Sequence, residues 1–153
     1  MVIFTIERTI LMKIFSIECL GNIQKFNWLA VRKGRIRLVA DWNSGNTEWL
    51  LHRLDSNVVY LECTGVVDEP NRWLCANTLK RKVFLADKDA AMTGPGGGWK
   101  IIPVDSDRFR LKCMNGSGTY CYLDGMTGKG FLMLREEEGV EGRSGTLWKL
   151  ALR

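Results

Sequence analysis

The sequence repeats Trp49-Leu50-Leu51 as Trp99-Lys100-Ile101 and again as Trp148-Lys149-Leu150. The three tryptophans are separated by 50 and 49 residues. A nearly constant interval that runs through most of a chain indicates internal duplication. We therefore predict one domain of three copies, over residues 15–57, 58–107 and 108–153, with residues 1–14 as an N-terminal extension.

Each copy carries the same four elements in the same order. The first alternates apolar and polar residues, in Phe15-Ser16-Ile17-Glu18-Cys19, Val59-Tyr60-Leu61-Glu62-Cys63 and Phe109-Arg110-Leu111-Lys112-Cys113. The second is an aromatic residue followed by leucine, in Trp28-Leu29, Trp73-Leu74 and Tyr122-Leu123. The third is Ile36-Arg37-Leu38, Val83-Phe84-Leu85 and Phe131-Leu132-Met133, and the fourth begins at the repeated tryptophan. A period of two predicts half-buried β-strands.

The segments between these elements are rich in Gly and Asn, which supply the backbone conformations of tight turns. No segment sustains a helical period with capping residues. The sequence therefore predicts an all-β domain of twelve strands with almost no helix.

This skeleton resembles the β-trefoil superfamily, and its aromatic-Leu pairs resemble the fascin-like branch that includes fascins and hisactophilin. The resemblance covers nearly the whole chain and implies a six-stranded barrel closed at one end by three hairpins. Ricin-type lectins carry Gln-x-Trp near the end of each copy, whereas Thr47, Gly97 and Thr146 stand two residues before the repeated tryptophans here. A fold does not determine a function, so both lectin-like and actin-associated roles are consistent with this skeleton.

The composition suits one globular domain and disfavours metal chemistry. The 153 residues are 46% hydrophobic, with a modest net charge of +5. The five cysteines include no C-x-x-C pair, and His52 is the single histidine. Three cysteines recur at equivalent strand positions, as core-filling thiols do. We expect reduced thiols, a cytoplasmic protein, and neither a metal nor another cofactor.

The chain shows no sequence feature of a membrane protein. No apolar run approaches the roughly 18 residues that a transmembrane helix needs. The apolar N-terminus is interrupted by Glu7 and Arg8 and lacks a basic start, which fits a signal peptide poorly.

Two places are candidates for glycan binding, because sugar sites pair hydrogen-bonding groups with an aromatic face. Trp42 has no counterpart in the other copies and lies in a polar stretch, which makes it a candidate for an exposed stacking ring. Asp68, Glu69 and Asn71 stand beside Trp73 in copy two. The alternative is a polar surface loop next to a core tryptophan.

Basic residues gather between the second and third elements of the copies. They are Arg32, Lys33, Arg35, Lys80, Arg81, Lys82 and Lys129. In a trefoil these connections are hairpins at the closed end of the barrel, so their charges are expected to converge on a polyanion or an acidic protein filament. The alternative is a solvated face that serves solubility. Nucleic acid is disfavoured because no stacking aromatics interleave with these residues.

The sequence favours a binding module over an enzyme, and we identify no catalytic residue. A catalytic arrangement of a nucleophile and a general base would have to use His52, which is the only histidine and lies on a predicted strand. Gly94-Pro95-Gly96-Gly97-Gly98 lacks the Gly-Lys-Ser/Thr ending of a phosphate loop. We favour glycan binding. One alternative is an actin-associated or acidic-protein-binding module, which would bundle filaments only as a homodimer. A weaker alternative is a protease inhibitor that uses residues 92–98.

Overall fold

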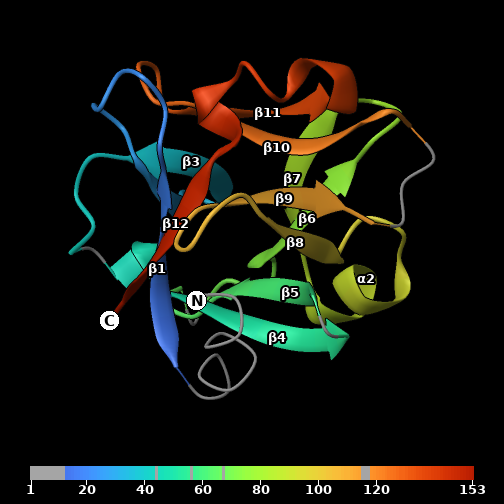
Figure 1. Cartoon of the computed structure of the whole chain (residues 1–153). Helices are drawn as coiled ribbons and strands as arrows, with labels where there is room; N and C mark the ends of the chain where they lie inside the picture. The colour runs from blue at the N-terminus through green and yellow to red at the C-terminus, as the bar shows by residue number, and fades with distance from the viewer. Residues whose placement is uncertain (1–12, 44, 56, 67, 115–117) are drawn as a thin grey trace.

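The computed structural model describes residues 13–43, 45–55, 57–66, 68–114 and 118–153 (Figure 1). These residues form twelve strands, all paired antiparallel. The strands of copy one are β1 (Ile14–Cys19), β2 (Trp28–Arg32), β3 (Arg35–Val39) and β4 (Trp49–Asp55). Those of copy two are β5 (Val58–Cys63), β6 (Trp73–Asn77), β7 (Lys82–Ala86) and β8 (Trp99–Pro103). Those of copy three are β9 (Phe109–Cys113), β10 (Tyr120–Met126), β11 (Phe131–Glu136) and β12 (Trp148–Leu152).

Helix is nearly confined to one short segment of the described residues. This is α2 (Lys88–Thr93), and the 3-10 segments are η1 (Gly45–Thr47), η2 (Glu137–Gly139) and η3 (Ser144–Thr146). The predicted all-β class with almost no helix is confirmed. None of the described helices is long and apolar enough to cross a membrane. The predicted extension lies outside the described residues except at 13 and 14, and β1 already begins at Ile14.

The barrel is built from the first and fourth strands, which pair between neighbouring copies. Strand β4 pairs with β5, β8 with β9, and β12 with β1, so that the last strand closes the barrel onto the first (Figure 1). The register is the same at all three junctions, with Trp49 opposite Cys63, Trp99 opposite Cys113 and Trp148 opposite Cys19. Closure pairs strands that would otherwise be edges.

The second and third strands of each copy form hairpins that close one end of the barrel. These are β2–β3, β6–β7 and β10–β11, and strands β3, β7 and β11 lie against one another. We call the three hairpins together the hairpin cap. Their turns use left-handed backbone at Lys33 and Gly34 in copy one, Arg81 in copy two and Gly130 in copy three. Glycine adopts this conformation without strain, which explains Gly34 and Gly130.

The repeated tryptophans form the centre of the core in three equivalent environments. Trp49, Trp99 and Trp148 are completely buried. Their indole nitrogens donate hydrogen bonds to the carbonyl oxygens of Leu29 (2.9 Å), Leu74 (3.0 Å) and Leu123 (3.1 Å). The acceptor in each copy is the leucine of its aromatic-Leu pair. The two motifs that define the sequence repeat are therefore bonded to each other, and the predicted threefold equivalence is confirmed.

The repeated cysteines also share one contact. Their thiols lie within hydrogen-bond range of the carbonyl oxygen three residues before the tryptophan of the neighbouring copy. The pairs are Cys19 with Gly145 (3.3 Å), Cys63 with Asn46 (3.3 Å) and Cys113 with Gly96 (3.7 Å). All five cysteines of the chain are buried and unbridged, as predicted. Burial raises the pKa of both Cys19 and Cys63 to about 12, so these thiols remain protonated at neutral pH.

Candidate functional site

A cavity of about 530 Å³ lies in copy two, beside the segment predicted from Asp68 to Trp73. Strand β4 contributes His52, β5 contributes Glu62, and β6 contributes Trp73. Its other lining residues are Pro70 and Arg72 from the loop before β6, and Asp87, Lys88 and Asp89 at the start of α2. We call this the copy-two cavity.

The Glu62 carboxylate organises one side of the copy-two cavity. One of its oxygens lies 2.9 Å from His52 Nε2, and the other accepts a hydrogen bond from Arg72 Nε at 2.8 Å. The Glu62 side chain is only 11% exposed, so both partners are needed to satisfy a carboxylate that is largely removed from water. The arrangement holds one carboxylate, one guanidinium and one imidazole in fixed positions.

The aromatic ring that the copy-two cavity presents is that of His52. The sequence suggested Trp73 for this role, but Trp73 is 4% exposed and belongs to a buried cluster beneath α2. The His52 ring lies over it, with centroids 4.7 Å apart, and the His52 side chain is 33% exposed. The interpretation of Trp73 as a stacking face is therefore wrong, because packing against His52 removes that face from solvent.

The outer part of the copy-two cavity is formed by the first residues of α2. Asp87 is the N-cap, and its Oδ1 accepts a hydrogen bond from the Ala90 N–H at 2.8 Å. Lys88 and Asp89 are exposed. Asp68, Glu69 and Asn71 are exposed as well and flank Pro70 rather than line the cavity. No group of three or more His, Cys, Asp and Glu in the described part of the chain could hold a metal ion.

The equivalent place in copy one is covered by Trp42. Counted from the last paired residue of the hairpin, Trp42 corresponds to Asp89 of copy two, and Trp28 corresponds to Trp73. The Trp42 and Trp28 rings stack with centroids 5.3 Å apart, and the Arg153 guanidinium lies 4.9 Å from the Trp42 ring centre. Trp42 is 36% exposed. It was predicted as an exposed ligand-stacking ring; its side chain is exposed, one face of the ring packs on Trp28, and its contact with a ligand stays a prediction.

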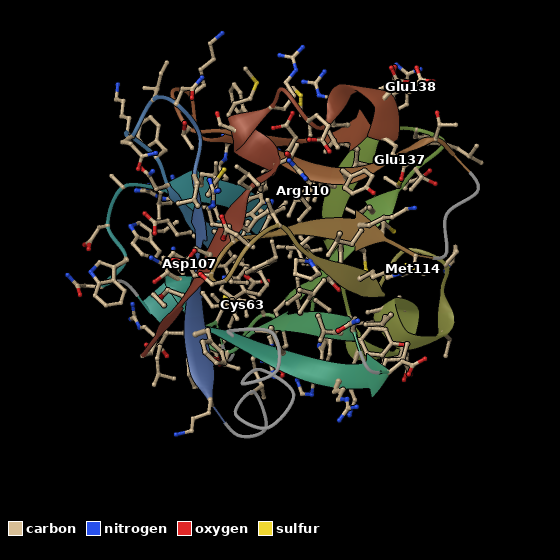
Figure 2. The ribbon with its side chains drawn as sticks, in the orientation of Figure 1. Cys63, Asp107, Arg110, Met114, Glu137 and Glu138 are labelled. Carbon is tan, nitrogen blue, oxygen red and sulfur yellow. The ribbon has the colours of Figure 1, made fainter. Side chains whose placement is uncertain are left out.

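In copy three the corresponding aromatic residue is already hydrogen-bonded. The Tyr122 hydroxyl donates to Glu137 Oε1 at 3.0 Å, and Lys112 Nζ lies 3.7 Å from the same oxygen. Glu137 and Glu138 follow β11 at the surface (Figure 2). Burial and the Glu137 carboxylate raise the pKa of Tyr122 to about 12. The three copies thus surround one symmetric aromatic position with different side chains: an indole in copy one, an imidazole in copy two and a carboxylate in copy three.

The predicted basic residues divide between the three hairpins. Arg32, Lys33 and Arg35 line a cavity of about 600 Å³ together with Arg37, the last cation of the same basic stretch. The basic residues of copy two, Lys80, Arg81 and Lys82, occupy the β6–β7 hairpin, where the Arg81 guanidinium lies 3.7 Å from the Tyr120 ring centre. Lys129 lines a separate cavity at the β10–β11 hairpin.

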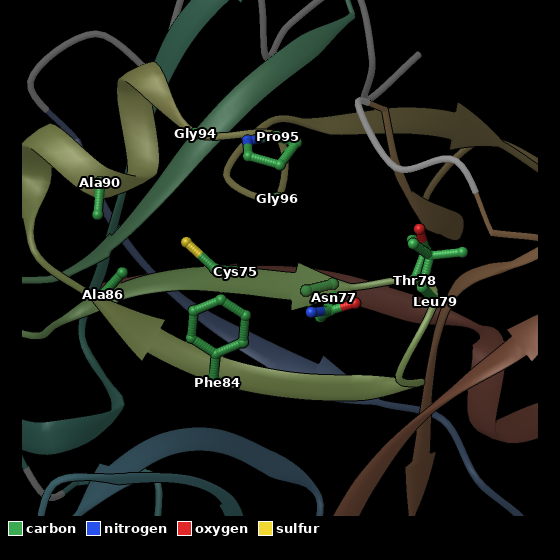
Figure 3. Close-up of a pocket in the computed structure, with 11 residues that line it drawn as sticks. Cys75, Asn77, Thr78, Leu79, Phe84, Ala86, Ala90, Gly94, Pro95 and Gly96 are labelled. Atoms are coloured by element: carbon green, nitrogen blue, oxygen red, sulfur yellow. The ribbon is translucent and has the colours of Figure 1, made fainter.

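The segment 92–98 packs against the fold instead of projecting from it. Gly96, Gly97 and Gly98 are buried. A Cβ on Gly96 would lie 2.1 Å from the Ala76 carbonyl oxygen, and one on Gly97 would lie 1.9 Å from that of Ala91. Together with α2 and the β6–β7 hairpin, the segment borders an apolar cavity of about 460 Å³ (Figure 3). Only Thr93 and Pro95 of the segment are exposed, so it does not offer the extended exposed loop that the protease-inhibitor hypothesis requires.

Sequence reasoning missed most of the residues that line the copy-two cavity. His52 and Glu62 belong to β4 and β5, the strands that join copies one and two, and they approach each other only through that pairing. One signal was available, because His52 corresponds to Ile102 and Ala151 in the other copies. A titratable residue that interrupts an apolar repeat position marks a place where one copy has diverged.

The fold has counterparts among solved structures. No family model matches the chain, and no curated protein matches it. A designed threefold-symmetric protein, ThreeFoil, superposes with a TM-score of 0.69 at 14% identity, covering 90% of this chain and 97% of the design. The chain is a β-trefoil.

This β-trefoil also superposes on part of an enzyme. The match is to the GlcNAcα1-4Gal-releasing endo-β-galactosidase from Clostridium perfringens, with a TM-score of 0.68 at 13% identity. It covers 93% of this chain but only 33% of the enzyme, so the chain spans about a third of that protein. At such identities the likeness shows the fold alone, and the fascin-like branch stays a prediction.

Proposed function

We propose that this β-trefoil is a non-enzymatic carbohydrate-binding module whose ligand occupies the copy-two cavity. The observation that carries the proposal is the divergence of copy two from copy one. Counted from the end of the hairpin, Asp89 holds the position of Trp42, and polar groups line a cavity beside Trp73, whereas in copy one Trp42 stacks on Trp28. In a threefold fold, such a difference in one copy is what an acquired binding site would produce.

The lining of the copy-two cavity suits sugar hydroxyl groups. The carboxylates of Asp87 and Asp89 accept hydrogen bonds from hydroxyls, while Arg72 and Lys88 donate to hydroxyl or ring oxygens. The volume of about 530 Å³ lies within the range of small-ligand sites. The partly exposed His52 ring, fixed between Trp73 and Glu62, supplies a flat surface for the C–H face of a sugar.

The charge around the copy-two cavity favours a neutral sugar. Carboxylates outnumber cations there: Asp87 and Asp89 line it with Lys88, Arg72 is paired with Glu62, and Asp68 and Glu69 lie on the neighbouring loop. A sialylated or sulfated ligand would meet these carboxylates at close range and would be disfavoured by like-charge repulsion. The endo-β-galactosidase that shares this fold is named for releasing GlcNAcα1-4Gal, a neutral disaccharide, which adds modest support.

A glycan array followed by calorimetry tests this proposal. The wild-type protein is expected to bind neutral glycans, and the binding is expected to persist at high salt because it depends little on net charge. Replacing Asp87 and Asp89 by Asn keeps shape and helix capping but weakens the acceptors, so affinity should fall at least about tenfold. The matched control is Glu138→Gln, which alters the residue that corresponds to Asp89 in copy three.

Several outcomes would overturn the proposal. Folded wild-type protein that binds no glycan on the array would reject it, as would the same loss of affinity in the Glu138→Gln control. Release of a shorter sugar from the bound oligosaccharide, seen by chromatography, would show that the chain is an enzyme. Unchanged affinity in the Asp87→Asn/Asp89→Asn protein would place the ligand elsewhere on the molecule.

A further inference from the structure

The positive charge of this chain is concentrated in the hairpin cap. The three hairpins, over residues 28–39, 73–86 and 120–136, contain nine of the 22 Lys and Arg residues and only two carboxylates, Asp124 and Glu136. The 13 cations in the rest of the chain are outnumbered by its 15 carboxylates. The net charge of +5 therefore arises from the cap, while the remainder of the protein is weakly acidic.

The cations of the β2–β3 hairpin differ from many of the others in their partners. Arg72, Arg108, Lys112 and Lys149 outside the cap each form an ion pair with a carboxylate, and Arg135 near the end of β11 pairs with Asp124. Among the described residues, no carboxylate pairs with any of the four cations that line the cavity of about 600 Å³. Three guanidinium groups and one ammonium group that share a cavity repel one another, so an anion bound there would be stabilised.

Large apolar side chains lie next to these cations. At the meeting point of the hairpins, Arg35 and Arg37 line a cavity of about 430 Å³ with Phe84 and Phe131. Phe84 is 42% exposed and Phe131 is 49% exposed, and the Arg37 guanidinium lies 5.7 Å from the Phe131 ring centre. Phe84 also borders the apolar cavity beside α2 (Figure 3).

Strand alternation places the two kinds of side chain on the same face. Residues 35 and 37 of β3, 82 and 84 of β7, and 131 and 133 of β11 share one side of their strands, opposite the core-packing Ile36, Val83 and Leu132. These six positions hold three cations and three large apolar residues. The cap therefore presents an amphipathic surface at one end of the barrel.

We infer that the hairpin cap binds the surface of a membrane that contains anionic lipids. Basic residues near such a surface are attracted to lipid phosphates, and exposed phenylalanines bury apolar area at the headgroup boundary. The cavity lined by Arg32, Lys33, Arg35 and Arg37 can receive a phosphorylated headgroup, because guanidinium groups bind phosphate oxygens in a bidentate way. A sulfated polysaccharide would use the charges but offers no apolar surface to cover Phe84 and Phe131.

This surface is independent of the proposed sugar site. The copy-two cavity shares no lining residue with the two basic cavities of the cap. A protein altered in the cap should therefore retain sugar binding, and one altered at Asp87 and Asp89 should retain vesicle binding. Failure of one proposal leaves the other intact.

Vesicle co-sedimentation tests the inference. The full chain is expected to sediment with vesicles that contain phosphatidylserine or phosphatidylinositol bisphosphate, but not with phosphatidylcholine alone, and added salt should release it. Arg32→Ala/Arg35→Ala should weaken binding roughly thirty-fold, since each basic residue near an anionic surface contributes about 1 kcal/mol. The matched control is Lys13→Ala/Lys100→Ala, which removes two exposed cations outside the cap.

Substitution of the two phenylalanines distinguishes binding to a membrane from binding to other polyanions. Phe84→Ala/Phe131→Ala keeps every charge, so vesicle binding should fall while binding to heparin stays unchanged. The inference is overturned if folded wild-type protein ignores anionic vesicles, or if the arginine variant and the lysine control bind them equally. It is also overturned if the phenylalanine variant keeps full vesicle binding, or if heparin or actin filaments are bound and vesicles are not.

Discussion

The indole ring of Trp42 stacks on that of Trp28, with centroids 5.3 Å apart, at the place that corresponds to the copy-two cavity. Trp28 and Trp73 are equivalent residues, yet one is covered by a tryptophan and the other by His52. The same repeat position therefore has a structural role in copy one and borders a candidate ligand site in copy two.

Trp42→Ala is expected to lower the free energy of unfolding by about 1–2 kcal/mol, because it removes an aromatic pair and exposes Trp28. Urea unfolding followed by circular dichroism measures the change. Sugar binding should be unaffected, since Trp42 lies outside the copy-two cavity. Loss of sugar binding with little loss of stability would instead restore Trp42 as a ligand-stacking residue.

The sequence was sufficient to predict the fold because its signal is repeated three times. Alternating strands recur at a fixed spacing from Trp49, Trp99 and Trp148, and each strand type must occupy equivalent surroundings when the copies pack about one axis. A strand that is hard to assign in one copy can be assigned from the equivalent strands of the other two. The same redundancy explains why the burial of Cys19, Cys63 and Cys113 was foreseen.

The candidate site was harder to predict because it depends on what differs between the copies. Glu62 and His52 meet across a strand pair, and Asp87 joins them from the start of a short helix that occurs in copy two. None of these contacts follows from local periodicity. The tryptophan at position 73 misled the prediction, because an aromatic residue next to polar residues has the same sequence pattern whether its ring is exposed or buried.

Trp99→Phe is expected to lower the free energy of unfolding by about 1–3 kcal/mol, because it leaves the buried Leu74 carbonyl oxygen without its indole donor and reduces core volume. Trp49→Phe and Trp148→Phe remove the same hydrogen bond to Leu29 and Leu123. The three proteins should therefore lose similar amounts, as measured by urea unfolding. A loss of stability in only one of the three variants would show that the copies do not contribute equivalently to the core.

Gly97→Ala is expected to be strongly destabilising, because the added Cβ would lie 1.9 Å from the Ala91 carbonyl oxygen in a buried segment. Relief of such a contact requires the backbone of α2 or of the 94–98 segment to move, at an expected cost of at least about 2 kcal/mol. Gly142→Ala is the control, since nothing lies within 4 Å of the Cβ that it adds. Thermal unfolding of the two proteins makes the comparison. Equal melting temperatures would mean that the segment moves freely.

The buried thiols should make the fold lose stability in alkali. Burial raises the pKa of Cys19, Cys63 and Cys75 from 9.0 to about 12, so the folded state retains three protons that the unfolded chain releases above pH 9. Unfolding is then favoured progressively as the pH rises from about 9 to about 12, by up to about 1.4 kcal/mol per pH unit for each thiol. Below pH 9 these groups are protonated in both states and contribute no pH dependence.

Urea unfolding at a series of pH values between about 8 and about 10.5 measures this slope, since the linkage relation ties it to the protons released on unfolding. Cys19→Ala/Cys63→Ala removes two of the three thiols, so its stability should decline with pH much less steeply than that of the wild type, whatever its stability at neutral pH. Tyr122, whose pKa is also raised to about 12, adds a further decline above pH 10 in both proteins. If the free energy of unfolding falls equally steeply with pH in the two proteins below pH 10, the two thiols ionise in the folded state as readily as in the unfolded chain. Local opening of the barrel would then expose them to solvent.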